Sequence, residues 1–289
     1  MEIIIGNMAG FCGGVRNAVT KTEKELETNS QIDCLGELVH NKEVIQELEK
    51  KGLHTIQTIE EAKNKVIIRA HGIEKEIYEK AKEKEIELID CTCPKVLNIH
   101  KLVQEYSEKG YFIVLVGESK HPEVIGTYSF CGEYKKQLSK QEEINQLVEE
   151  IVKSEKTNIL VVAQTTFHGE KFELITKEIK EKLKEMLGDK LEIKIENTIC
   201  NATALRQQET KELATNVDFM IIIGGRNSSN TNKLYEIAKQ YGKGALLIEN
   251  KSEIDIKDLS GVKTIGIMAG ASTPEKSILD VVEYIKKES

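Results

Sequence analysis

Several features that define other classes of protein are missing from this 289-residue sequence. No apolar stretch approaches the 18 residues of a membrane-spanning helix, so we expect no membrane span. The formal net charge of −7 leaves no basic excess to offset phosphate repulsion, which argues against a general nucleic-acid binder. The amino terminus runs from a short apolar stretch straight into a glycine-rich segment, with no room for a signal peptide. We therefore expect a cytoplasmic protein.

Cysteine is sparse, and the six that occur do not suggest a disulfide framework. Thiols stay reduced in the cytoplasm, so metal binding or catalysis is the better interpretation. Three of the cysteines head segments with the same internal spacing. A histidine or serine follows each by 28 residues, and a third polar residue follows after 31 or 44 more. The three sets are Cys12, His40 and His71; Cys93, His121 and Thr165; and Cys200, Ser228 and Ser272.

Each of these nine residues comes just after a short apolar run. Apolar runs alternating with charged helical stretches are typical of parallel strands in βα units. Ligands of open α/β sheets bind beyond the carboxyl ends of the strands, so nine such ends predict one shared polar site. The expected strands lie at 3–5, 34–35, 66–68, 88–89, 113–116, 159–162, 193–195, 220–223 and 265–268.

The positions of the three prolines support this assignment of strands and helices. Each proline directly follows a motif residue or lies one position beyond it, and the first helical position favours proline. The helix amino ends would then direct free N–H groups toward an anion such as a diphosphate. We expect helices at 15–28, 42–51, 74–84, 95–109, 170–187, 202–215, 231–241 and 275–287. The expected α/β domains are 13–94, 95–191 and 192–289, with the strand in 1–12 joining the third.

Cys91 competes with Cys93 for the ligand position of the second set. The 28-residue spacing leads from Cys93 to His121, whereas from Cys91 it leads to a residue outside the pattern. The two side chains would also point to opposite sides of an extended backbone. We therefore predict that Cys93 is the ligand, and that Cys91, Cys34 and Cys131 are small buried side chains.

Three converging thiolates suit an iron–sulfur cluster. Structural zinc usually takes four protein ligands. A catalytic zinc with three cysteines is an alternative, but ligation by thiolates alone fits iron–sulfur better. With three cysteines, a [4Fe–4S] cluster leaves its fourth iron open to a substrate.

The other strand ends supply donors for phosphate oxygens. Glu123, the only carboxylate within the motifs, has two interpretations. It stabilises the helix start after Pro122, or it donates a proton from a carboxyl whose pKa is raised by burial. The candidate substrate-binding residues are His40, His71, His121, Thr165, Thr166, Ser228, Ser229, Asn230 and Ser272.

Nine ordered motifs along the whole chain resemble those of the 4-hydroxy-3-methylbut-2-enyl diphosphate reductase family, which acts last in the methylerythritol phosphate route to isoprenoids. One departure is Cys91, where alanine is commoner in the family; it adds an oxidisable thiol nearby. The motifs are Gly10-Phe11-Cys12-Gly13-Gly14-Val15, Val39-His40-Asn41, Arg69-Ala70-His71-Gly72, Thr92-Cys93-Pro94, His121-Pro122-Glu123, Gln164-Thr165-Thr166, Asn197-Thr198-Ile199-Cys200, Asn227-Ser228-Ser229-Asn230 and Ala271-Ser272-Thr273.

The resemblance implies a trefoil of three pseudo-equivalent α/β domains with parallel sheets around a central [4Fe–4S] cluster held by Cys12, Cys93 and Cys200. The substrate hydroxyl would bind the open iron. Glu123, with Thr165 and His121, would serve catalysis by passing protons. The residues implied to hold the diphosphate are Ser228, Asn230, Ser272, His40, His71 and His121.

The implied reaction is a reductive dehydroxylation that gives isopentenyl and dimethylallyl diphosphate. Two electrons arrive one at a time, and hydroxide leaves as water. The chain has no GxGxxG dinucleotide fingerprint, because Gly10, Gly13 and Gly14 surround a cysteine instead. Electrons must therefore come from a partner protein, which we expect to be a ferredoxin or flavodoxin.

Two other readings of the repeat stay open. Quinolinate synthase also uses three lone cysteines, although the motifs at His121 and Ser228 count against it. A non-catalytic cluster sensor or electron carrier is a second alternative. It leaves the polar donors unexplained, because a carrier needs no phosphate pocket.

Overall fold

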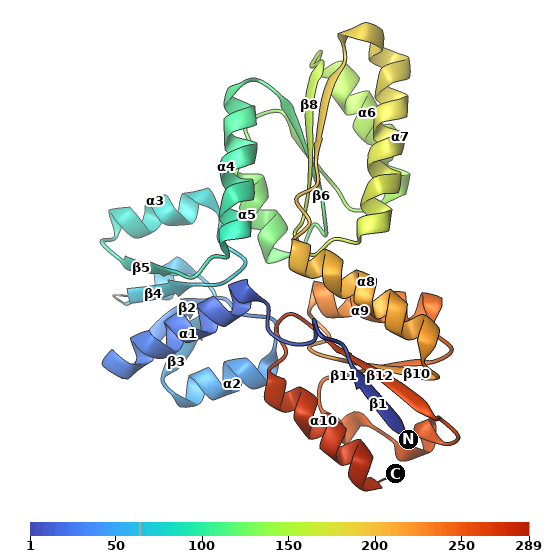
Figure 1. Ribbon diagram of the computed structural model, residues 1–289. Helices are drawn as coiled ribbons and strands as arrows, with labels where there is room; N and C mark the ends of the chain where they lie inside the picture. Colours follow the sequence, from blue (N-terminus) through green and yellow to red (C-terminus); the bar gives the residue numbers. More distant parts are fainter. Residues whose placement is uncertain (64, 289) are drawn as a thin grey trace. The chain divides into compact units, whose positions relative to one another are not determined.

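The structure, a computed structural model, describes residues 1–63 and 65–288 (Figure 1). Its strands form three four-stranded parallel sheets flanked by helices, which confirms the predicted α/β class. The described chain divides into two compact units. Unit 1 comprises residues 1–31, 37–54 and those from 201 on, and unit 2 comprises residues 32–36 and 55–200.

Unit 1 contains one sheet, with the strand order β1-β12-β10-β11. Ile221 and Ile267 on one face pack with Val281 of helix α10, while Met220 and Met268 on the other face pack in the cluster that includes α9. Figure 1 shows α10 and the pair α8 and α9 on opposite sides of this sheet. The elements of unit 1 are β1 (Glu2–Ile5), α1 (Gly13–Thr28), α2 (Lys42–Lys50), α8 (Asn201–Asn216), β10 (Phe219–Ile223), α9 (Ser229–Tyr241), β11 (Ala245–Ile248), β12 (Thr264–Ala269) and α10 (Glu275–Glu288).

Unit 2 contains the other two sheets. The first has the order β3-β2-β4-β5, and only the last two residues of β3 belong to this unit. Val66 and Ile68 of β4 pack with Ala81 of helix α3. The elements are β2 (Ile32–Leu35), β3 (Leu53–Ile56), β4 (Lys65–Ile68), α3 (Lys75–Glu83) and β5 (Glu87–Asp90).

The second sheet of unit 2 has the order β7-β6-β8-β9 and is buried on both faces. Val114 and Val161 face the helices α6 and α7, whereas Ile113 and Leu160 face α4 and α5. Figure 1 shows these two helix pairs on opposite sides of β6 and β8. The elements are α4 (Pro94–Glu108), β6 (Phe112–Val116), α5 (Pro122–Phe130), β7 (Lys135–Leu138), α6 (Ile144–Lys153), β8 (Asn158–Ala163), α7 (Gly169–Leu187) and β9 (Glu192–Glu196).

All nine expected strands and all eight expected helices are present, with ends within two residues for the helices. The sequence reasoning missed strands β3, β7 and β11 and helices α5 and α6. Buried Ile144, Leu147, Val148 and Ile151 have helical spacing and could have predicted α6. The domain boundaries stay a prediction, and β9, which they assigned to the third domain, pairs with β8 in the second sheet of unit 2.

Among the described residues, no helix combines the length and apolar character needed to cross a membrane.

Candidate active site

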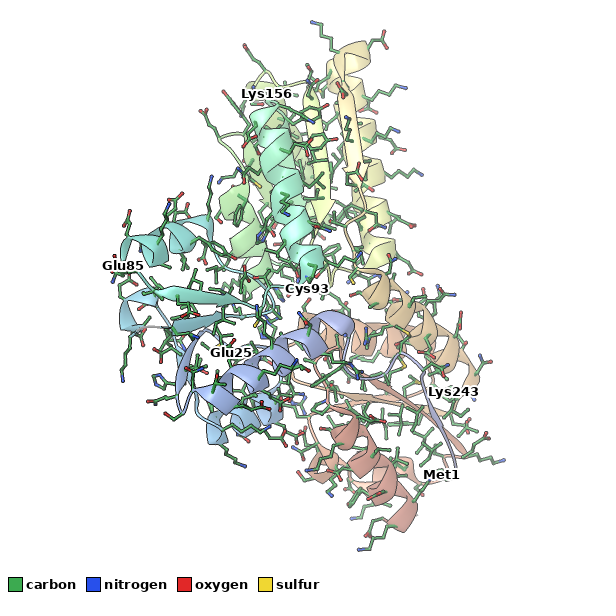
Figure 2. The ribbon with its side chains drawn as sticks, turned by 60° about the vertical axis from the view of Figure 1, so that its left-hand side comes forward. Met1, Glu25, Glu85, Cys93, Lys156 and Lys243 are labelled. Carbon is green, nitrogen blue, oxygen red and sulfur yellow. The ribbon has the colours of Figure 1, made fainter. Side chains whose placement is uncertain are left out.

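Cys93 occupies the turn between β5 and α4, as the repeat predicts. It is the N-cap of α4, and Pro94 is the first helical residue. Its backbone N–H donates to the carbonyl oxygen of Ala70 at 3.0 Å, next to His71. Figure 2 labels Cys93 at the end of α4 where the helix begins. Cys93 therefore lies at the positive end of the α4 dipole.

His121 has the equivalent place at the start of α5, again followed by a proline. Its ring Nδ1 accepts a hydrogen bond from the backbone N–H of Glu123 at 3.2 Å. Nδ1 therefore bears no hydrogen, and the neutral ring carries its proton on Nε2. The rings of His71 and His121 pack edge to face, with centroids 5.5 Å apart. Two predicted substrate-binding histidines thus lie together in unit 2.

Glu123 is buried, with 2% of its surface exposed. Its two carboxyl oxygens accept from the backbone N–H and the hydroxyl of Thr165, each at 2.6 Å. Burial raises the pKa of Glu123 to about 7, although the hydrogen bonds from Thr165 oppose the rise. A carboxyl with this pKa can donate or accept a proton near neutral pH. Its burial therefore favours the proton-donor interpretation over a role in helix initiation alone.

Thr165 also connects this carboxyl to a predicted cluster ligand. Its carbonyl oxygen accepts from the backbone N–H of Cys200 at 3.0 Å. The segment before Cys200 is held to β8 by Thr198, whose hydroxyl donates to the carbonyl of Ala163 at 2.5 Å. Three predicted residues, Glu123, Thr165 and Cys200, therefore lie next to one another in unit 2.

Gln164 orients the neighbouring hydroxyl of Thr166. Its side-chain amide donates to Thr166 Oγ1 at 2.8 Å, and its amide oxygen accepts from the backbone N–H of Glu118 at 3.0 Å. Gln164 begins the motif Gln164-Thr165-Thr166, and its side chain binds neighbouring protein groups on both sides.

Cys12 in unit 1 is the N-cap of α1. Its Sγ accepts from the backbone N–H of Val15 at 3.4 Å. Its own N–H donates to the carbonyl oxygen of Ala271 at 3.0 Å, one residue before Ser272. The loops that bear Cys12 and Ser272 are thereby joined.

His40 and Ser272 also meet in unit 1. The Ser272 hydroxyl donates to the carbonyl oxygen of His40 at 2.9 Å. A Cβ added to Gly225 would lie 2.8 Å from the same oxygen, so only glycine permits the approach of these loops. The loops that follow β2, β10 and β12 therefore bring His40 close to the start of α9.

The start of α9 presents three buried polar residues. Ser228 is the N-cap and accepts from the backbone N–H of Thr231 at 3.3 Å. Ser229 is 5% exposed and Asn230 is 3% exposed. The side-chain amide of Asn230 has no hydrogen-bond partner among the described residues. A buried amide without a partner is costly, and an anionic ligand would satisfy it.

The six cysteines fall into two groups of three. Cys12, Cys93 and Cys200 are half-buried, whereas Cys34, Cys91 and Cys131 are fully buried. Burial raises the pKa of both Cys34 and Cys131 to about 12, which keeps these thiols protonated. The buried group confirms the prediction that these three are small packed side chains.

The histidines outside the repeat have other surroundings. His100 is 3% exposed and stacks on Phe130 with centroids 4.3 Å apart; burial lowers its pKa to about 4. His54 is exposed at β3, and His168 is the buried N-cap of α7. One neighbour of the site was missed by the sequence reasoning: Glu37, which contacts His40 and Asn227.

This fold and these strand-end residues match one known family. The family model described as LytB protein matches residues 3–286, and the chain belongs to this family. The family is known to be one of iron–sulfur proteins. This confirms the family resemblance drawn from the nine motifs.

Full-length relatives are named 4-hydroxy-3-methylbut-2-enyl diphosphate reductase. The relative from Clostridioides difficile (strain 630) is 40% identical over 289 residues, which cover 99% of each chain. The relative from Aquifex aeolicus (strain VF5) is 42% identical over 293 residues, which cover 99% of this chain and 96% of the other.

Two solved structures are similar over almost the whole chain. One is an (E)-4-hydroxy-3-methylbut-2-enyl diphosphate reductase described as the terminal enzyme of the non-mevalonate pathway. It is 39% identical, with a TM-score of 0.70 and coverage of 99% of this chain and 100% of the other. The second, a diphosphate reductase from Plasmodium falciparum, is 30% identical, with a TM-score of 0.87 and coverage of 98% and 87%.

Proposed function

We propose that the chain reduces 4-hydroxy-3-methylbut-2-enyl diphosphate to isopentenyl and dimethylallyl diphosphate. The observation that supports this most directly is the buried Glu123, whose pKa of about 7 suits proton transfer. It lies beside Thr165, whose carbonyl receives the N–H of the predicted ligand Cys200. Full-length similarity to reductases with that name supplies the substrate.

The cofactor of the proposal is a [4Fe–4S] cluster held by Cys12, Cys93 and Cys200. The donor set fits, because these three thiols are half-buried while the other three cysteines are buried. Two of them are also N-caps and so lie at the positive end of a helix dipole. The proposal requires the three cysteines to converge, as in the trefoil of three domains that the resemblance implies. When bound, the cluster supplies electrons one at a time.

The reaction consumes two electrons and two protons. The C–O bond of the substrate breaks, the hydroxyl leaves as water, and a C–H bond forms at either end of the allyl group. Protonated Glu123 can donate to Thr165 Oγ1, which then turns its own hydrogen toward the substrate. Thr165 thereby relays one proton between a buried acid and the ligand, and the second comes from the region of the substrate diphosphate.

N–H and O–H groups hold the diphosphate in this proposal. His121 offers Nε2–H, because its Nδ1 already accepts from the Glu123 backbone. The amide of Asn230 and the N-terminus of α9 offer further N–H groups. His40, His71, Thr166, Ser228, Ser229 and Ser272 complete the proposed binding set. Each donor lost from such a site would cost about 1–3 kcal/mol.

Electrons would come from a ferredoxin or flavodoxin, because the sequence has no dinucleotide fingerprint of its own. We place the reaction in the cytoplasm, where such donors and reduced thiols occur together.

The decisive experiment is anaerobic oxidation of a reduced viologen dye by the reconstituted protein on addition of 4-hydroxy-3-methylbut-2-enyl diphosphate. We expect rapid oxidation and five-carbon diphosphate products. Inorganic diphosphate is the control and should oxidise no dye. Absence of oxidation by protein with verified iron and sulfide content would overturn the proposal and favour the quinolinate-type or electron-carrier alternatives.

A further inference from the structure

Glu37 is a carboxylate in unit 1 to which the proposed reaction gives no role. It follows β2 in the loop that leads to α2. Its Oε2 accepts from His40 Nδ1 at 3.5 Å and from the side-chain amide of Asn227 at 3.1 Å. The His40 side chain is 14% exposed and that of Glu37 is 44% exposed. Glu37 therefore connects His40, which is proposed to bind the diphosphate, with Asn227, which precedes the N-cap of α9.

A carboxylate beside an anion site is electrostatically unfavourable unless neighbouring groups bind the carboxylate. The hydrogen bond from His40 is the main cause that lowers the pKa of Glu37. The hydrogen bond from Asn227 and the charge of Lys42 lower it further, whereas partial burial opposes them. The group is therefore ionised at neutral pH.

The hydrogen bond fixes which nitrogen of His40 bears a hydrogen. A carboxylate only accepts, so His40 Nδ1 must be protonated. In His121 the opposite holds, because Nδ1 accepts from the Glu123 N–H. His121 can thus donate to phosphate through Nε2 as a neutral ring. In His40 it is likewise Nε2 that is left to face a ligand, because Nδ1 is held by Glu37.

The neighbouring loops hold both the backbone of His40 and the side chain of Glu37. Ser272 donates to the His40 carbonyl, and Gly225 allows the α9 loop to approach that oxygen. Asn227 binds the Glu37 oxygen that also receives His40. The ring of His40 is therefore oriented by Glu37, while its backbone is anchored independently.

We propose that Glu37 is a positioning residue for anion recognition: held by Asn227, it accepts from His40 Nδ1 and thereby orients Nε2 of that ring toward the phosphates of the substrate. The identity of the ligand rests on the proposed function. The contact network itself does not.

A double-mutant cycle tests this proposal on the reconstituted holoenzyme. Binding of inorganic diphosphate is measured by calorimetry, together with KM and kcat for the allylic diphosphate, in Glu37→Ala, His40→Ala and the double variant. We expect Glu37→Ala to weaken diphosphate binding and raise KM about tenfold, the loss of a charge-assisted hydrogen bond, with kcat within twofold. In the His40→Ala background the same change should alter binding less than twofold.

Glu47→Ala is the matched control, because it removes an exposed glutamate from α2 of the same unit. It should leave diphosphate binding unchanged. Glu37→Gln, which keeps the shape and an acceptor, replaces Glu37→Ala in the cycle if the alanine variant does not fold. It should weaken binding less than alanine does.

An equal loss from Glu37→Ala in both backgrounds would overturn the inference, as would wild-type protein that fails to bind diphosphate. Wild-type protein that binds diphosphate but does not oxidise the dye would instead overturn the proposed function, and the cycle would still report on Glu37.

Discussion

The strand ends of unit 1 and unit 2 differ in chemistry although they follow the same spacing. Unit 2 has a buried carboxyl with a pKa of about 7, two half-buried cysteines and an edge-to-face histidine pair. Unit 1 has mainly neutral hydroxyl and amide donors at helix starts, such as Ser228, Asn230 and Ser272. The first position of the repeat is a thiol in all three sets, whereas the second and third are an imidazole or a hydroxyl. Unit 2 is thus suited to proton transfer and unit 1 to anion binding.

The largest expected effect concerns the two neighbouring cysteines of unit 2. We expect Cys93→Ala to lose the cluster completely, because one of three ligands is removed, whereas Cys91→Ala keeps it. Cys91 is 1% exposed and Cys93 is half-buried at the start of α4. Iron and sulfide content after anaerobic reconstitution measures both. Equal iron content in the two variants would refute the assignment of Cys93 as the ligand from the 28-residue spacing.

The next effect is on turnover. We expect Glu123→Gln to bind substrate with nearly normal KM but to turn over roughly 10²- to 10⁴-fold more slowly, because the amide cannot donate an acidic proton. Glu133→Gln is the matched control, an exposed glutamate of unit 2 that should keep normal turnover. Near-normal kcat in Glu123→Gln would return Glu123 to a role in starting α5.

The same side chain makes stability depend on pH. Because the pKa of Glu123 is about 7 in the folded protein and the ordinary value is 4.5, the unfolded chain releases this proton first as pH rises. The contribution of Glu123 to the free energy of unfolding is therefore fully present below pH 4.5. It is lost as the pH rises from 4.5 through about 7. The loss amounts to about 3 kcal/mol. Denaturant unfolding at pH 5 and pH 8 should show a smaller difference for Glu123→Gln, and equal pH dependence in both proteins would contradict the shift.

The sequence predicted every central strand and the edge strands β1, β5 and β9, and it missed three other edge strands. The missed strands β3, β7 and β11 each lie at an edge of their sheet. The strand β7 reads Lys-Lys-Gln-Leu and is only partly buried, so it has no apolar run to detect. Central strands such as β6 are buried on both faces and read as continuous apolar stretches.

The site was predicted in its members but not in its connections. The repeat and the family resemblance supplied Glu123 and Thr165, yet their contact joins residues 42 apart along the chain. Glu37 and Asn227 are 190 apart, and no spacing rule relates them. Long-range pairs of this kind follow from the packing of loops, which local sequence patterns do not encode.

The smallest expected effect tests the anion-binding character of unit 1. We expect Ser272→Ala to raise KM about tenfold while kcat changes little, because it removes the hydroxyl that donates to the His40 carbonyl and holds that loop in place. Ser260→Ala, at an exposed serine of the same unit, is the control and should behave as wild type. A fall in kcat that matches that of Glu123→Gln would mean that unit 1 takes part in the chemical step, and the division of labour between the two units would then be wrong.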